Sequence, residues 1–199
     1  VYIAEEISVH TPSEHTIKGK RLDMEIQISF YGQSKGDIAK QVVLSFLFEK
    51  KAGYYNKFLD DLDFYNLPNK YYREKEIVNN LFIPKILYSV TGDTPDDLPV
   101  MKPFSFYTYD GSLTMPPCSE DTIHYVASEP IPVGSVVLGL AREALKMPDM
   151  QSVDEETGEK KTFIDHEEVE NYRNTQNLNN RSVFFFDHKR YCGASINNI

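Results

Sequence analysis

Residues 109–120 read YDGSLTMPPCSE and form the most specific segment of the chain. The segment follows a Tyr-rich stretch, Phe104 to Tyr109, whose composition and alternation predict a β-strand. A GSLT-x-PPC-x-E pattern behind such a strand is difficult to produce by chance. It therefore indicates a particular fold rather than a generic turn.

Working outward from this segment, periodicity predicts strands more often than helices. In Leu22 to Tyr31, apolar side chains at even positions alternate with polar ones at odd positions, which is typical of a strand with two different environments. The stretch Gln41 to Glu49 is nearly all apolar, as expected for a strand covered on both faces. The other expected strands are Ile3 to His10, Asp121 to Ala127 and Ser182 to Phe186.

Helical periodicity is limited to two short stretches, 55–62 and 136–145. Long connections cover 67–85, 91–103 and 147–170, and the acidic part 149–161 is expected to be a solvated excursion. No repeat or linker divides the chain. We therefore expect one domain over 1–199, mostly β with peripheral short helices.

Composition excludes several classes of function. The 199 residues carry a net charge of −9 and no basic run, so nucleic acid is not an expected partner. The longest apolar stretches fall far short of the ~20 residues that cross a bilayer, so no direct membrane span is expected. Val1 already lies inside a predicted strand, and we expect the true beginning of the protein to lie upstream.

Four segments together resemble the α-class carbonic anhydrases, in the family's order and over essentially the whole chain. They are HTPSEHTI (10–17), MEIQIS (24–29), YDGSLTMPPCSE (109–120) and NYRNTQNLN (171–179). The resemblance implies a large, twisted, mainly antiparallel central sheet. It begins part-way through the family's domain, so the N-terminal portion with its proton-shuttling histidine is absent from this chain.

The family's chemistry depends on three histidines that hold a zinc ion, and the resemblance places them at Ser8, His10 and Gln27. One ligand of three is retained. A serine hydroxyl is not a usual zinc ligand at neutral pH, and a glutamine carbonyl suits calcium better than zinc. We therefore predict that the chain holds no zinc and no other cofactor, and that it is a pseudoenzyme.

The surrounding polar residues are better preserved than the ligands. The resemblance implies that Thr114 would accept a hydrogen bond from a zinc-bound hydroxide and pass its own to Glu14, with Glu25 behind the third ligand. Without zinc, we expect Ser8, Glu14, Gln27 and Thr114 to satisfy one another as a buried polar group. Leu113 and Val43 would line the apolar wall of this vestigial pocket.

Other residues that the resemblance singles out have structural explanations. We expect His15 to make a structural hydrogen bond, and His124 to bond nearby backbone where the family has a tryptophan. His166 and His188 are expected on the surface. The residues expected to tie the C-terminal segment into the domain are Asn171, Arg173 and Gln176.

The two cysteines leave three alternatives open. In many secreted family members the cysteine of the PPC run pairs with one near the N-terminus, which favours an extracellular or luminal location. Cys118 could instead be a free buried thiol or form a bridge to Cys192.

Three functions compete at this stage. The favoured one is a catalytically inactive domain that serves as a structural or protein-binding module, with protein partners or a larger assembly. The second is an active zinc enzyme for CO₂ hydration that recruits replacement ligands, for example His10 with His124 and a carboxylate. The third is a binder of a small molecule or anion in the emptied pocket.

Overall fold

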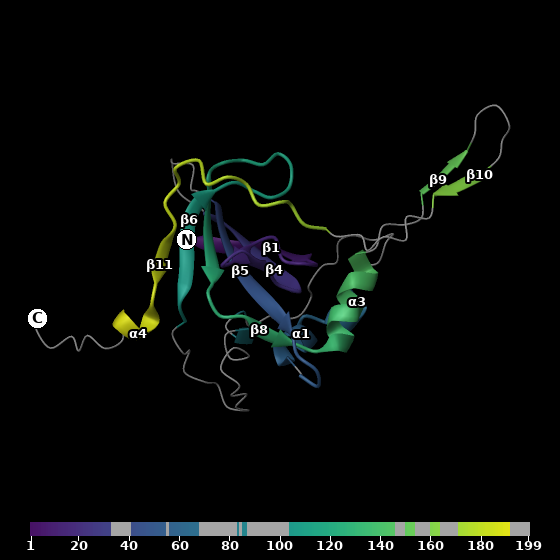
Figure 1. Cartoon of the computed structure of the whole chain (residues 1–199), viewed down its shortest axis with the longest axis horizontal. Helices are drawn as coiled ribbons and strands as arrows, with labels where there is room; N and C mark the ends of the chain where they lie inside the picture. Colours follow the sequence, from purple (N-terminus) through teal and green to yellow (C-terminus); the bar gives the residue numbers. More distant parts are fainter. Residues whose placement is uncertain are drawn as a thin grey trace, which may run out of the picture.

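A computed structural model describes residues 1–32, 41–54, 56–67, 83, 85–86, 104–145, 150–153, 160–163 and 171–191. Its largest element is a seven-stranded sheet (Figure 1), which confirms a mostly β fold with a few short helices. Six strands form a path in the order β1 (Tyr2–His10), β4 (Met24–Gly32), β5 (Gln41–Lys50), β7 (Thr122–Ala127), β6 (Phe106–Gly111) and β11 (Phe184–Phe186). The seventh, β8 (Ile131–Val133), pairs with β5.

The sheet is mixed, with β5 at its centre. Pairing is antiparallel between β1 and β4, β4 and β5, β6 and β7, and β6 and β11. Both β7 and β8 run parallel to β5. A long connection separates β5 from β7, and a connection of this kind is what a parallel pair requires.

The two faces of the sheet carry different side chains. On β4, the apolar residues Met24, Ile26 and Ile28 are completely buried and join the main core cluster. The opposite face presents Glu25 and Gln27, which are also buried. Both faces of this strand are therefore covered, and the polar one must find hydrogen bonds inside the protein.

Helices pack against the apolar face. Phe58 and Leu59 of α1 (Lys57–Asp61) and Val137 and Leu138 of α3 (Ser135–Leu145) belong to the same core cluster as the β4 side chains. The Asn56 side chain begins α1 by accepting hydrogen bonds from two main-chain N–H groups. Two other short helices lie in the described residues, η1 (Phe64–Asn66) and α4 (His188–Tyr191).

Two small hairpins lie outside the main sheet. The first pairs β2 (Thr16–Ile17) with β3 (Lys20–Arg21). The second pairs β9 (Met150–Val153) with β10 (Lys160–Phe163), at the two ends of the stretch 149–161 that was expected to be a solvated excursion. The described ends of this stretch satisfy their main-chain groups by pairing with each other.

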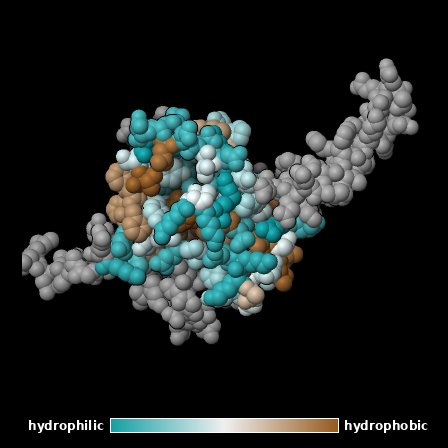
Figure 2. All heavy atoms as spheres, in the orientation of Figure 1, coloured by the Kyte–Doolittle hydropathy of each residue, from teal (hydrophilic) through white to brown (hydrophobic). Residues whose placement is uncertain are grey.

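Both ends of the strand path expose apolar side chains. Tyr2 and Ile3 of β1 are exposed, as are all three phenylalanines of β11. Figure 2 shows apolar atoms gathered on the side of the molecule where β11 lies. Among the described helices, none is long and apolar enough to span a membrane.

Candidate functional site: a vestigial metal centre beside a cavity

Strand register brings the three positions of the expected metal site together. Ser8 on β1 lies directly opposite Gln27 on β4, and His10 lies opposite Glu25. Because side chains two residues apart on a strand share a face, all three expected ligand positions point to the same side of the sheet. The register thus preserves the layout of the site although two of its side chains differ from histidine.

His10 is oriented as a metal ligand would be. Its Nδ1 lies 2.8 Å from the main-chain carbonyl oxygen of Asn171. A carbonyl only accepts hydrogen bonds, so Nδ1 carries the proton and Nε2 carries the free lone pair. That Nε2 is buried and has no hydrogen-bond partner.

Gln27 is oriented in the opposite sense. Its side-chain nitrogen donates hydrogen bonds of 2.9 Å to Glu14 Oε2 and of 2.9 Å to Glu25 Oε1. Both N–H groups of the amide are therefore directed at buried carboxylates. The Gln27 amide nitrogen is a hydrogen-bond donor, whereas a zinc ligand at this position would have to offer a lone pair.

Ser8 and Thr114 do not join this polar cluster, contrary to expectation. The Ser8 hydroxyl donates to the Glu6 carboxylate at 3.2 Å, toward the exposed end of β1. Thr114 is half-buried, and its hydroxyl has no hydrogen-bond partner within the described part of the chain. The second oxygen of Glu14 instead accepts the main-chain N–H of Arg173 at 2.8 Å.

The donor set does not fit a zinc ion. Within the described ranges, no group of three or more His, Cys, Asp or Glu residues could hold a metal. His10 supplies one suitable nitrogen, whereas Ser8 and Gln27 are engaged with carboxylates.

Glu25 and His15 form a buried ion pair next to the expected ligand positions. The Glu25 carboxylate accepts the main-chain N–H of His15 at 2.8 Å and the His15 Nδ1–H at 2.7 Å. Burial alone would raise the pKa of Glu25, but the His15 charge and hydrogen bonds hold it well below its usual range. Burial alone would lower the pKa of His15, but the negative charge of Glu25 outweighs the effect of burial, so the pKa of His15 is raised. The raised pKa favours the charged ring, and the hydrogen bonds of His15 to Glu25 and to Tyr109 give it the expected structural role.

His124 bonds the nearby backbone through one ring nitrogen, and its other ring nitrogen, Nδ1, is buried without a hydrogen-bond partner. The residue is 1% exposed, and its Nε2 donates to the main-chain oxygen of Ser112 at 3.0 Å, as expected from the sequence. Burial, with a smaller contribution from the His15 charge, lowers the pKa of His124 to about 4. Its ring stacks on Tyr109 with centroids 4.9 Å apart. The neutral imidazole thus fills the position of an aromatic side chain.

Asn171 and Arg173 tie the C-terminal segment to the site, as predicted. The Asn171 side chain donates to the Val9 carbonyl and accepts the Thr11 N–H, both at 2.8 Å. The prediction for Gln176 is wrong, because among the described residues this exposed side chain bonds only to the nearby carbonyl of Asn174. Arg173 makes the remaining links, through its main-chain N–H to Glu14 and through its guanidinium to the Ser112 hydroxyl and the Leu113 carbonyl.

The remaining predicted residues have mixed outcomes. His188 is half-buried and its Nδ1 lies 2.8 Å from Ser105 Oγ, so its expected surface position is wrong; a neighbouring hydroxyl offers it a partner. Val43 is 1% exposed and Leu113 is half-buried, and their place in the wall of the site stays a prediction. Cys118 is a half-buried free thiol. His166 and Cys192 lie outside the described residues.

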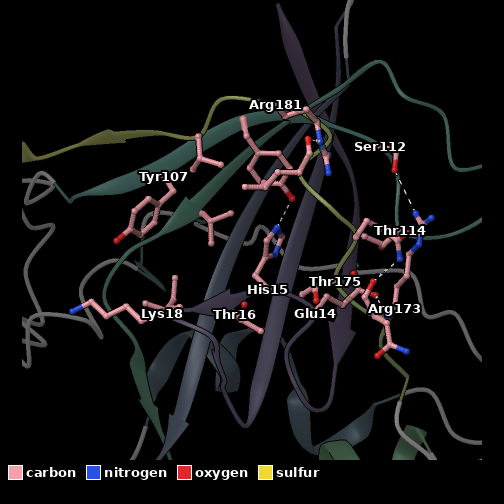
Figure 3. Close-up of a pocket in the computed structure, with 17 residues that line it drawn as sticks. Glu14, His15, Thr16, Lys18, Tyr107, Ser112, Thr114, Arg173, Thr175 and Arg181 are labelled. Carbon is pink, nitrogen blue, oxygen red and sulfur yellow. Dashed lines mark hydrogen bonds between the residues drawn. The ribbon is translucent and has the colours of Figure 1, made fainter.

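Beside the vestigial metal site lies a cavity that the sequence did not indicate (Figure 3). Its volume is about 460 Å³, and it opens between the 173–183 segment and the strands β6 and β7. Glu14, His15 and Thr114 reach it, whereas Ser8, His10 and Gln27 do not line it. The signal available in the sequence was the pair Tyr107 and Tyr109, two residues apart on one strand and hence on one face.

Comparisons with known proteins identify the family. A sequence model described as eukaryotic-type carbonic anhydrase matches residues 1–187. Dioscorin DB3L of Dioscorea polystachya is 26% identical over 189 residues, which cover 95% of this chain and 56% of that protein. A carbonic anhydrase of Klebsiella pneumoniae is 28% identical over 144 residues, covering 72% of this chain and 50% of that protein. The chain thus spans about half the length of these curated relatives.

Solved structures agree on the fold. The α-carbonic anhydrase of Thermovibrio ammonificans, in complex with the inhibitor sulfanilamide, superposes with a TM-score of 0.61 at 23% identity, over 92% of this chain and 62% of that one. Dioscorin complexed with ascorbate superposes with a TM-score of 0.57 at 24% identity, over 94% of this chain and 62% of that one. Taken with the match over residues 1–187, these findings place the chain in the family of eukaryotic-type carbonic anhydrases.

Proposed function

We propose that this chain is a catalytically inactive carbonic anhydrase-like domain that acts as a structural or protein-binding module, with protein partners or as a subunit of a larger assembly. The observation that carries the proposal is the orientation of Gln27. Its amide nitrogen is held between Glu14 and Glu25, where it donates to two buried carboxylates and has no lone pair to offer a metal. No step of CO₂ hydration is therefore assigned to these residues.

The scaffold does not need a metal ion to neutralise its buried charges. Glu25 is neutralised by His15, and Glu14 accepts N–H groups from Gln27 and from the main chain of Arg173. Buried charges that are paired and hydrogen-bonded are tolerated in a folded protein. This supports a domain that folds and persists without zinc.

Replacement ligands find little support. His124 uses one ring nitrogen on Ser112, and both ring nitrogens of His15 are engaged, with Glu25 and with the Tyr109 hydroxyl. An active site would need at least three donors converging at about 2.0–2.1 Å from one point. Among the described residues, two histidine nitrogens are buried without a hydrogen-bond partner, His10 Nε2 and His124 Nδ1, and two nitrogens fall short of three donors.

The catalytic half of the proposal is tested by zinc and activity measurements on one preparation. The purified chain is incubated with excess zinc, desalted, assayed for bound zinc and then tested for CO₂ hydration by stopped flow. We expect far less than one zinc per chain and hydration at the rate of buffer alone. Stoichiometric zinc accompanied by turnover would overturn the assignment.

The binding half rests on the exposed ends of the sheet. Sheet edges offer unpaired main-chain groups, and here they also carry exposed aromatic side chains such as Tyr2 and Phe184. Cross-linking of wild type and of a Phe184→Lys, Phe186→Lys variant, each in an extract of the source cells, identifies proteins that depend on this edge. A protein retained by wild type and lost by the variant supports the module; identical cross-links from both would remove β11 as the contact surface.

A further inference from the structure

The cavity beside the vestigial site has an apolar interior of a size suited to a small ring system. Its volume of about 460 Å³ lies within the range of roughly 300–1,000 Å³ that small-molecule sites occupy. Its apolar walls come from β2, β6, β7 and the 178–183 segment, through Ile17, Tyr107, Tyr109, Val126, Leu178 and Val183. The tyrosine rings are part of a fixed aromatic wall, because Tyr107 packs on Phe185 and Tyr109 stacks on His124 with the Arg181 guanidinium over its ring.

Most of the charged side chains around the cavity are positive, although the net charge of the whole chain is −9. Lys18, Arg173 and Arg181 all line the cavity, and Figure 3 shows them on different sides of it. The only carboxylate in the lining is Glu14, and both of its oxygens already accept hydrogen bonds. A local excess of positive charge in an acidic protein favours an anion.

Several donors at the cavity are available to a ligand. Arg181 uses Nε and Nη2 on the carbonyls of Leu178 and Asn177, which fixes the guanidinium and leaves Nη1 free. The hydroxyl of Tyr109 lies 2.7 Å from His15 Nε2, which donates to it when the ring is charged. The proton of that hydroxyl then remains free to be donated. Within the described residues, the hydroxyl of Tyr107 and the ammonium of Lys18 have no hydrogen-bond partner.

We propose that this cavity binds a small aromatic carboxylate, with its ring in the apolar interior and its carboxylate near Arg181 and the Tyr109 hydroxyl. The pairing of a planar carboxylate with a guanidinium is geometrically favoured. The site is distinct from the metal positions, because His10 and Gln27 do not line it. The proposal therefore goes beyond the proposed function and does not depend on whether the domain is inactive.

The test uses 2-naphthoate as the probe and 2-naphthalenemethanol as its neutral counterpart, with binding measured by titration calorimetry. We expect saturable binding of the carboxylate and at least about 10-fold weaker binding of the alcohol, since a hydrogen bond to a charged group contributes about 1.5–3 kcal/mol. Arg181→Gln should weaken naphthoate binding by about 10-fold for the same reason. Arg142→Gln, which removes the same charge from exposed helix α3, should leave it unchanged.

A second variant tests whether the aromatic ring of the ligand occupies the cavity. Val126 is 3% exposed and forms part of the cavity wall, so Val126→Phe should fill the space and abolish binding. If this variant fails to fold, the Arg181→Gln comparison still decides. Absence of naphthoate binding at millimolar concentrations, equal binding of the alcohol, or binding unaffected by Arg181→Gln would each overturn the proposal.

Discussion

Two substitutions should convert the vestigial centre into a zinc site. Ser8 and Gln27 face each other across β1 and β4, and His10 lies two residues from Ser8 on the same face. The double variant Ser8→His, Gln27→His therefore places three imidazoles on one side of the sheet. Two supporting contacts are already present: Asn171 holds His10, and the Glu25 carboxylate lies where the new histidine at position 27 can donate to it.

The expected gain in affinity follows from the number of ligands. Four-ligand structural zinc sites bind with about 10–16 kcal/mol, or about 2.5–4 kcal/mol for each ligand. Two added ligands should contribute about 5–8 kcal/mol, which at about 1.4 kcal/mol per tenfold corresponds to roughly 10⁴- to 10⁶-fold in Kd. Adding Glu25→Gln to the double variant should reduce this affinity by about 10- to 100-fold, because it weakens the orientation of one ligand.

The assay is competition with a chromophoric zinc chelator, together with circular dichroism to establish that each variant is folded. The matched control is Ser8→His, Ser29→His, which adds the same two side chains but moves one of them one pair along β4, opposite Glu6. We expect no comparable gain in the control. If the control binds zinc as tightly as the double variant, or if the folded double variant does not bind, the register argument is refuted.

Three further predictions concern the stability of the same face, each measured by urea unfolding. Gln27→Leu should lower the free energy of unfolding by about 3–5 kcal/mol at pH 7, because two buried carboxylates each lose a hydrogen bond worth about 1.5–3 kcal/mol. The control Ser29→Ala, on the same strand face, should lower it by under about 1 kcal/mol. Equal losses in the two variants would contradict this reasoning. Gly111→Ala should cost about 1–3 kcal/mol, since its Cβ would lie 2.8 Å from a ring carbon of Tyr109 and 2.9 Å from one of His124; an unchanged midpoint would show that the rings can move apart. The pKa of His124 is about 4 in the folded protein against an ordinary 6.5, so its contribution to the free energy of unfolding is fully present above pH 6.5 and is lost as the pH falls through 4, by up to about 3 kcal/mol. The free energy of unfolding of His124→Phe should therefore depend less on pH over this range than that of wild type. Parallel pH dependences of the two proteins would exclude His124 as the cause.

Sequence periodicity predicts most of the sheet because the strands bury their two faces differently. The alternation in 22–31 appears in the structure as buried apolar side chains on one face of β4 and buried polar ones on the other. The parallel pairing of β7 with β5 could not be predicted in this way, since it joins strands about 80 residues apart and depends on a connection with no strong pattern of its own. Local pattern thus predicts which residues form strands more reliably than which strands become neighbours.

The candidate site shows the same division. The positions of Ser8, His10 and Gln27 follow from the resemblance and from the two-residue period of a strand. The direction of the Gln27 amide does not, because it depends on two carboxylates placed by different segments, Glu14 before the β2 hairpin and Glu25 within β4. The cavity was missed for a related reason: its walls combine residues 14–18 with residues 173–183, which become neighbours only in the folded chain.

If the chain is the inactive domain proposed above, the hydrogen bonds around Gln27 explain how a metal site could be lost without loss of the fold. A zinc ion at this position would place positive charge close to Glu14 and Glu25, and its removal alone would leave both carboxylates short of partners. Here a neutral amide at position 27 donates to both of them, and the charged ring of His15 balances Glu25. A glutamine is suited to this role because it offers two N–H groups from one nitrogen, whereas a neutral histidine offers one. Gln27→His alone should therefore bind zinc more tightly than wild type yet be less stable in the presence of a chelator, and a variant that gained affinity with no loss of metal-free stability would show that the amide is not the substitute for the ion.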